Sequence, residues 1–81
     1  MTMLQQAVDH LVRGIVSEPD DVLVEERRAG RQDVIDVRVA PADLGRVIGR
    51  SGRTAQALRT VVDALADGRR VRVNIVDTDA A

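Results

Sequence analysis

Glycine and arginine gather in one stretch of this chain, LGRVIGRSGRTAQALRTVV, which runs from Leu44 to Val62. The stretch holds three of the chain's six glycines and four of its twelve arginines, and it contains no acidic residue. Glycine weakens helices and strands, so stability alone does not favour this composition. Arginine carries a planar guanidinium that forms forked hydrogen bonds to phosphate. The stretch therefore predicts a place where an anionic ligand approaches the backbone at Gly49 and Gly52.

The spacing of the glycines excludes two common nucleotide-binding motifs. A P-loop requires G-x-x-x-x-G-K-[ST], and a dinucleotide fingerprint requires G-x-G-x-x-G. Val47 stands where each motif has its first glycine, and the chain has no lysine. What remains is a Gly-Arg-Ser-Gly turn, residues 49–52, between two short helices. The second helix directs its positive end toward this turn and Arg53 adds a full charge, so we expect a phosphate-binding loop. A plain turn between helices is the structural alternative.

Length and composition indicate one globular domain without a metal or redox site. We expect a single domain over residues 1–81, with 77–81 as a frayed tail. The absence of cysteine and the single histidine exclude disulfides, thiolate metal sites and a histidine zinc cluster. Ser51 has no histidine near it in the sequence, and the acidic residues form no acid–base motif. We therefore expect neither enzyme activity nor a cofactor.

No feature of the sequence indicates a membrane. No apolar run approaches the roughly 18 residues of a membrane span, and the N-terminus lacks a signal-peptide pattern. These absences predict a cytoplasmic protein. The net charge of −1 argues against binding polyanions with the whole surface, so we expect a local site instead.

The residues before the glycine stretch predict a helix and a hairpin. Apolar residues recur at helical spacing over about 3–16, and Thr2 with Gln5 fits a capping box. Alternating residues predict a first strand from Val22 to about residue 28 and a second after a turn at 29–32. Only one face of this hairpin is apolar, so helices must cover it.

The glycine stretch itself predicts a helix–turn–helix core over about residues 41–66. Pro41 opens a short helix that ends at Ile48, and a second helix covers about 53–66, with Gly68 as its C-cap. A third strand follows, in which Val71, Val73 and Ile75 alternate. The apolar face of the second helix is expected to comprise Ala55, Leu58, Val61, Val62 and Leu65.

The string VIGRSGRTAQALRTVV, residues 47–62, resembles the signature of KH domains. That signature is an aliphatic residue and an isoleucine before a GxxG turn, with aliphatic residues at three-residue spacing after it. The resemblance implies that the loop clamps about four nucleotides of a single strand. Ala55 departs from the pattern, because the family often has a larger aliphatic residue there. The predicted RNA-binding residues are Arg46, Ile48, Gly49, Arg50, Ser51, Gly52, Arg53 and Ala55.

The element order α-β-β-α-α-β, which spans the whole chain, resembles small bacterial KH proteins of the KhpA type. The resemblance implies an α+β, type II KH fold, with a three-stranded mixed sheet and helices packed on one face. It also implies a cytoplasmic RNA chaperone that forms homodimers or pairs with a larger Jag-type KH protein, with a link to cell-wall homeostasis and cell length. The sequence leaves open a second interpretation, a dimerisation adapter in which RNA contact is secondary.

Overall fold

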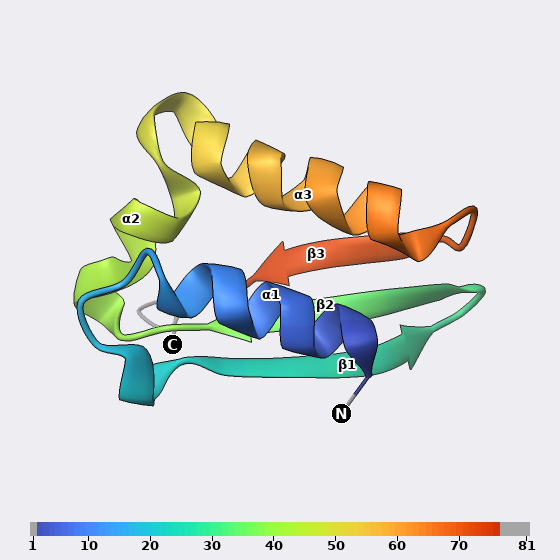
Figure 1. The fold of residues 1–81 in the computed structure, drawn as a ribbon, viewed down its shortest axis with the longest axis horizontal. Helices are drawn as coiled ribbons and strands as arrows, with labels where there is room; N and C mark the ends of the chain where they lie inside the picture. The colour runs from blue at the N-terminus through green and yellow to red at the C-terminus, as the bar shows by residue number, and fades with distance from the viewer. Residues whose placement is uncertain (1, 77–81) are drawn as a thin grey trace.

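A computed structural model describes residues 2–76 of the chain (Figure 1). The helices and strands follow the predicted order α-β-β-α-α-β, which is confirmed. The tail predicted at 77–81 lies outside the described residues. The elements are α1 (Met3–Arg13), η1 (Pro19–Asp21), β1 (Leu23–Ala29), β2 (Gln32–Arg38), η2 (Pro41–Asp43), α2 (Leu44–Ile48), η3 (Arg50–Gly52), α3 (Arg53–Ala66) and β3 (Val71–Ile75), where η marks a short 3-10 turn.

The sheet is mixed and has β2 at its centre. β1 and β2 pair antiparallel, and β3 pairs parallel with β2. The hairpin turn lies where the sequence predicts it, since Ala29 pairs with Gln32 across a two-residue loop. Gly30 takes the positive φ of 64° that such tight loops favour. Helix α3 lies between β2 and β3 in the chain, and it supplies the crossover that a parallel pair requires.

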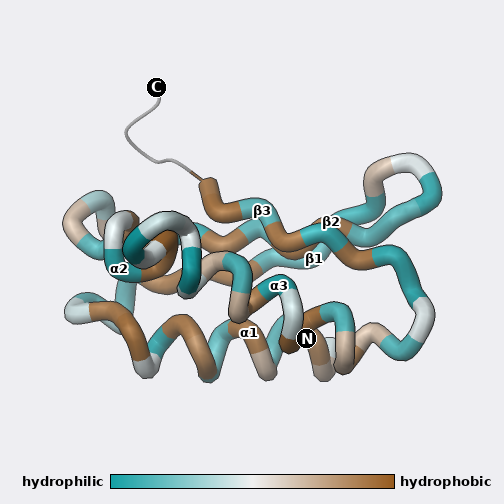
Figure 2. The backbone as a smooth tube through the Cα atoms, turned by 90° about the horizontal axis from the view of Figure 1, so that it is seen from above, coloured by the Kyte–Doolittle hydropathy of each residue, from teal (hydrophilic) through white to brown (hydrophobic). Residues whose placement is uncertain are grey.

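Helices α1 and α3 pack on one face of the sheet and leave the other face open (Figure 2). The core between the two layers is entirely aliphatic, because the chain contains no aromatic residue. Each fully buried Val, Leu or Ile side chain in such a core stabilises the fold by about 1.5–3 kcal/mol relative to its exposed state. The core residues are Leu4, Val8, Val12, Val22, Val24, Ile35, Val37, Val39, Val47, Leu58, Val62, Ala66 and Val73.

Three helix ends differ from the prediction. The helix predicted to open at Pro41 begins as the 3-10 turn η2, and α2 itself starts at Leu44. Helix α1 begins with the expected capping box but ends at Arg13 rather than near residue 16. Gly14 follows it, and the Ile15 amide bonds to the Val12 carbonyl three residues back, which interrupts the helical hydrogen-bond pattern. Helix α3 is capped by Asp67 rather than by Gly68. Asp67 already has a left-handed φ of 51°, which a short polar side chain tolerates.

The apolar face of α3 is narrower than predicted. Its buried residues are Ala55, Leu58, Val62 and Ala66, which recur at intervals of three and four. Val61 and Leu65 are 38% and 48% exposed, so their assignment to the covered face was wrong. Each of them lies one position before a buried residue, about 100° around the helix from it, and is turned away from the sheet. Val61 instead lines a shallow apolar groove of about 160 Å³ between α1 and α3.

Candidate nucleic-acid interface

The loop between α2 and α3 begins at a glycine that the packing requires. Gly49 has φ 79° and ψ 169°, a backbone conformation that is essentially restricted to glycine. Its amide donates to the Gly45 carbonyl at 2.9 Å and closes the last turn of α2. A Cβ atom on Gly49 would lie 2.8 Å from the backbone nitrogen of Thr54 and closer still to its Oγ1. Gly49 therefore lets α2 end directly against the first turn of α3.

The second loop glycine has a different environment. Gly52 also has a positive φ, 74°, but a Cβ atom there would meet nothing within 4 Å. Ser51 precedes it with a φ of 56°, which is uncommon for a residue with a side chain. Such conformations cost of order 1–3 kcal/mol and cluster at functional sites. The loop thus presents bare backbone at Gly52 and an exposed hydroxyl at Ser51.

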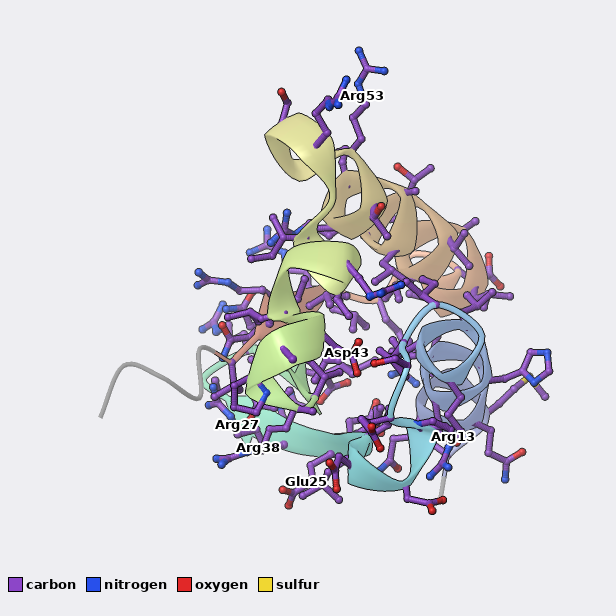
Figure 3. All side chains as sticks on the ribbon, turned by 90° about the vertical axis from the view of Figure 1, so that its left-hand side faces the viewer. Arg13, Glu25, Arg27, Arg38, Asp43 and Arg53 are labelled. Carbon is purple, nitrogen blue, oxygen red and sulfur yellow. The ribbon has the colours of Figure 1, made fainter. Side chains whose placement is uncertain are left out.

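Positive charge at the loop is not neutralised by neighbours within residues 2–76. Arg50 and Arg53 are exposed, and neither has a carboxylate within ion-pair distance there. Arg53 projects outward from the loop, away from the body of the domain (Figure 3). Helix α3 starts with neither a side-chain cap nor an acidic residue in its first turn. The positive end of α3 is therefore open to an anion.

Arg46 differs from the loop arginines because it contacts a buried carboxylate. Its Nε lies 3.4 Å from Oδ1 of Asp43, whose side chain is fully buried, whereas 62% of the Arg46 side chain is exposed. Asp43 also accepts hydrogen bonds from the Ser17 amide at 2.9 Å, the Ser17 hydroxyl at 2.8 Å and the Glu18 amide at 3.0 Å. These bonds fasten the start of α2 to the loop after α1.

The hydrogen bonds to Asp43 also change its titration. The bond from the Ser17 backbone amide, with further bonds from the Ser17 hydroxyl and the Glu18 amide and the charge of Arg46, lowers the pKa of Asp43, while burial opposes this shift. Sequence reasoning did not place Asp43 among the site residues. The available signal was an acidic residue at a helix start three positions before an arginine, but its main partner, Ser17, is 26 residues away in the chain.

The two aliphatic residues predicted for the interface lie in different environments. Ile48 is 39% exposed beside the loop and offers apolar surface to a ligand. Ala55 is only 3% exposed, so little of its surface is available to a ligand, and its contact with RNA stays a prediction. The spacing of α3 turns Ala55 inward along with Leu58 and Val62. The structure therefore brings Arg46, Ile48 and residues 49–53 together at the surface and leaves Ala55 beneath them.

Comparison with known proteins identifies this arrangement. Residues 5–76 match the family model described as KhpA/KhpB, KH domain. The chain belongs to this family. Helix α2, the loop at residues 49–52 and helix α3 all lie within the matched residues. Neither the family nor its named members indicate a catalytic activity.

Relatives in the family are similar over nearly their whole length. The RNA-binding protein KhpA of Leifsonia xyli subsp. xyli is 65% identical over 75 residues, which cover 93% of this chain and 99% of that protein. The RNA-binding protein KhpA of Streptomyces coelicolor is 61% identical over 77 residues, 95% of this chain and 96% of that protein. The RNA-binding protein KhpA of Mycobacterium tuberculosis is 58% identical and covers 90% of both chains. No solved structure shows a significant match.

Residues 2–76 contain no group of three or more His, Cys, Asp or Glu side chains that could hold a metal ion. Within the same residues, no helix combines the length and the apolarity needed to cross a membrane.

Proposed function

We propose that this protein binds single-stranded RNA, with the loop at residues 49–52 receiving the sugar-phosphate chain. The observation that carries the proposal is the open surface at Gly52, which lies between two exposed arginines at the uncapped start of α3. RNA as the ligand is supported by the family and by its members named RNA-binding proteins. An anion at this loop meets backbone donors, a helix dipole and full positive charges together.

The contacts divide between backbone and side chains. In this proposal a phosphate lies against Gly52, where no side chain intervenes, and Arg50 and Arg53 donate to its oxygens. Ile48 gives a ribose or base an apolar surface next to the loop. Arg46 contributes less than the loop arginines, because Asp43 already engages its Nε. The KH loop spans about four nucleotides, so a single domain holds only a short segment of RNA.

The composition supports weak binding with little base preference. The chain has no aromatic residue on which bases can stack, and stacking is a major source of affinity in other single-strand binders. Weak binding through the RNA backbone suits an RNA chaperone or post-transcriptional regulator, and we propose that role in the cytoplasm. The link to cell-wall homeostasis and cell length is proposed from the family resemblance alone.

Pairing with a second KH domain would compensate for the weak single site through avidity. We propose that the chain forms a homodimer, a heterodimer with a larger Jag-type KH protein, or both. The joint family description of KhpA and KhpB supports a partner from the same family. The apolar groove between α1 and α3, lined by Leu11, Ile15 and Val61 among others, is the candidate surface. This groove also favours the second candidate function, a dimerisation adapter in which RNA contact is secondary.

Ultraviolet crosslinking to a single-stranded RNA, followed by mass spectrometry of the crosslinked peptides, separates the two functions. RNA binding through the loop predicts crosslinks within Ile48–Arg53. An adapter predicts crosslinks that are sparse and scattered over the surface. Crosslinks confined to another element would contradict the loop assignment while leaving RNA binding intact.

A further inference from the structure

The open face of the sheet carries a pocket that the candidate loop does not use. Figure 2 shows that no described helix covers the side of the sheet opposite α1 and α3. Alternate residues of the strands belong to this side, because successive side chains of a strand point to opposite faces. Side chains from all three strands surround a pocket of about 320 Å³ on this face, which is at the small end of the range for ligand sites. The lining residues are Arg27, Ala29, Gln32, Val34, Arg72 and Asn74.

The strand register places an arginine on each side of an apolar floor. Arg27 on β1 pairs with Val34 on β2, and Val34 in turn pairs with Arg72 on β3. Neighbouring strands are about 4.8 Å apart, so the two arginine backbones stand roughly 10 Å from each other. Val34 belongs to the open face yet is only 3% exposed, as expected if the arginine stems flank it. A flat ring or a phosphate fits between two such side chains.

Asp36 orients one side of this pocket. Its Oδ2 accepts from Nε of Arg27 at 2.7 Å, and its Oδ1 accepts from Nδ2 of Asn74 at 3.0 Å. Arg72 has no carboxylate within ion-pair distance among residues 2–76. The two arginines and this aspartate leave the pocket with a net charge of +1. Arg38, further along β2, projects from the same open side as Arg27 (Figure 3).

We propose that this pocket binds one nucleotide of an RNA strand, as a second contact beyond the loop. The phosphate lies against Arg72, which has no carboxylate partner among residues 2–76, and Arg27, held by Asp36, flanks the base over Val34 and Ala29. The carboxamides of Gln32 and Asn74 face the edge of the base. Guanidinium groups bind phosphates and also stack on planar rings, which favours a nucleotide over an acidic peptide. The inference rests on the proposed RNA binding, and a free mononucleotide shares the same chemistry.

An RNA strand reaches both sites only when it is long enough. The longest dimension of the domain is 33 Å. About twelve nucleotides exceed this length even at the roughly 3.4 Å spacing of stacked bases, whereas a tetranucleotide is too short to hold the loop and the pocket at the same time. The pocket on the sheet therefore contributes to the binding of long RNA and not of short RNA.

The test combines nuclear magnetic resonance titrations with binding measurements on the full chain. Adenosine monophosphate, a tetranucleotide and a twelve-nucleotide RNA are each titrated into labelled wild type. The variant Arg72→Gln leaves the Arg27–Asp36 pair intact, and Arg59→Gln on α3 is the charge-matched control on the other side of the sheet. Circular dichroism verifies that both variants are folded.

We expect adenosine monophosphate to shift the amide signals of Val34, Arg72 and Asn74. Arg72→Gln weakens the binding of the twelve-nucleotide RNA roughly fivefold, near the upper end for one exposed ion pair, and leaves the tetranucleotide unaffected. It also lowers the salt slope of the longer RNA by about 0.7 relative to Arg59→Gln.

The experiment tests the pocket assignment and the loop assignment separately. Equal binding by the two variants, with shifts confined to residues 49–53, overturns the pocket and leaves the loop assignment standing. If adenosine monophosphate shifts the pocket signals and neither RNA does, the pocket is a free-nucleotide site and the proposed RNA contact there is overturned. Shifts at Val34 and Arg72 with an aspartate-rich peptide and no response to nucleotides overturn the assignment of the ligand.

Discussion

The two glycines of the loop serve different purposes although the GxxG pattern treats them alike. Gly49 has no room for a side chain, because the backbone nitrogen of Thr54 would lie 2.8 Å from a Cβ atom. Gly52 has room, since nothing within 4 Å would meet a Cβ atom there. Packing therefore explains why residue 49 is glycine. At residue 52, only the positive φ and the open surface favour glycine. The open surface is where the proposed function places a phosphate.

Alanine substitutions separate these two roles. We expect Gly49→Ala to destabilise the fold by about 2 kcal/mol or more, through both the contact with Thr54 and the unfavourable backbone conformation. Gly52→Ala costs only about 1–2 kcal/mol for its left-handed conformation, and the folded protein binds RNA more weakly because a methyl group covers the open surface. Urea unfolding and fluorescence anisotropy with a labelled RNA measure the two effects.

Gly68→Ala is the matched control for Gly52→Ala. Gly68 has a φ of 87° and nothing within 4 Å of a Cβ atom, but it lies at the opposite end of α3 from the loop. The Gly68→Ala variant should lose a similar amount of stability and keep full affinity for RNA. If Gly52→Ala and Gly68→Ala bind RNA equally well, the open surface at Gly52 is not a contact.

Residue types and short spacings predicted most of the loop, but not what lies beneath it. The glycines, the flanking arginines and the bounds of α3 follow from local rules on helix breakers and apolar spacing. The same spacing predicts Ala55 on the apolar face of α3, but how little of its side chain a ligand can reach is decided by the sheet that α3 covers. The role of Asp43 does not follow from these local rules, because its partners at residues 17–18 become neighbours only in the folded chain.

At the scale of elements, the five-residue helix α2 depends on tertiary contacts for its stability. Helices this short do not persist alone in water. Val47 is fully buried in the core, and Asp43 fastens the start of the helix to the loop after α1. The position of the GxxG loop therefore depends on a carboxylate that must remain ionised. A second ion pair, between Arg27 and Asp36, braces the hairpin on the open face.

The ionisation of these two carboxylates makes stability depend on pH. The hydrogen bond from the Ser17 amide lowers the pKa of Asp43, and the bond from Arg27 lowers the pKa of Asp36, each below an ordinary value of 3.8. A lowered folded-state pKa gives stability that is fully present above the unfolded pKa and is lost as pH falls through the folded pKa. We expect the urea midpoint to be level near neutral pH and to fall below about pH 4.

Asp43→Asn tests the contribution of the buried carboxylate. The variant keeps the shape but loses the charge, and one amide hydrogen of the new side chain faces an existing donor. Its urea midpoint should be lower at neutral pH and should decline less on acidification than that of the wild type. Asp63→Asn, at an exposed position on α3, controls for the loss of one negative charge. An unchanged midpoint for Asp43→Asn at neutral pH would show that the anchor is dispensable.

The pattern of residues along each element predicted the element order and most bounds, and the differences have a local cause at the helix ends and a tertiary cause on α3. The hairpin, its turn and the third strand follow from alternation and turn residues. The end of α1 and the cap of α3 differ by one to three residues, because hydrogen bonding at Ile15 and the backbone of Asp67 decide them locally. The width of the covered face of α3 was overestimated, because apolar spacing does not show how many residues a three-stranded sheet can reach.

At the scale of the whole molecule, the two helices that cover one face of the sheet leave some of their own apolar side chains exposed. Leu11 and Val61 are each 38% exposed, and they line the groove between α1 and α3. Leu65, 48% exposed, follows Val61 one turn along α3. Contiguous exposed apolar residues commonly mark interaction sites. A two-fold axis through this surface would place equivalent α3 helices against each other.

Val61→Arg tests whether the groove mediates dimerisation. Because Val61 is partly exposed, an arginine is accommodated without unfolding the core. We expect a folded monomer in sedimentation, with several-fold weaker binding of long RNA through lost avidity. Thr60→Arg, which adds the same charge at an exposed position outside the groove, should leave assembly unchanged. A Val61→Arg protein that sediments as the wild type does would remove this groove from the interface.

The most direct test of the account is the RNA affinity of Arg50→Asp combined with Ser51→Asp, measured over a range of salt concentrations. Both residues are exposed, so the variant should fold normally, and its two carboxylates should abolish binding at the loop. Arg59→Asp with Thr60→Asp makes the same charge change elsewhere on α3 and should retain binding. For the wild type, log affinity should fall with log salt by about 0.7 for each of roughly two to four phosphate contacts. A folded loop variant that binds RNA as tightly as the wild type, with the same salt dependence, would contradict the account.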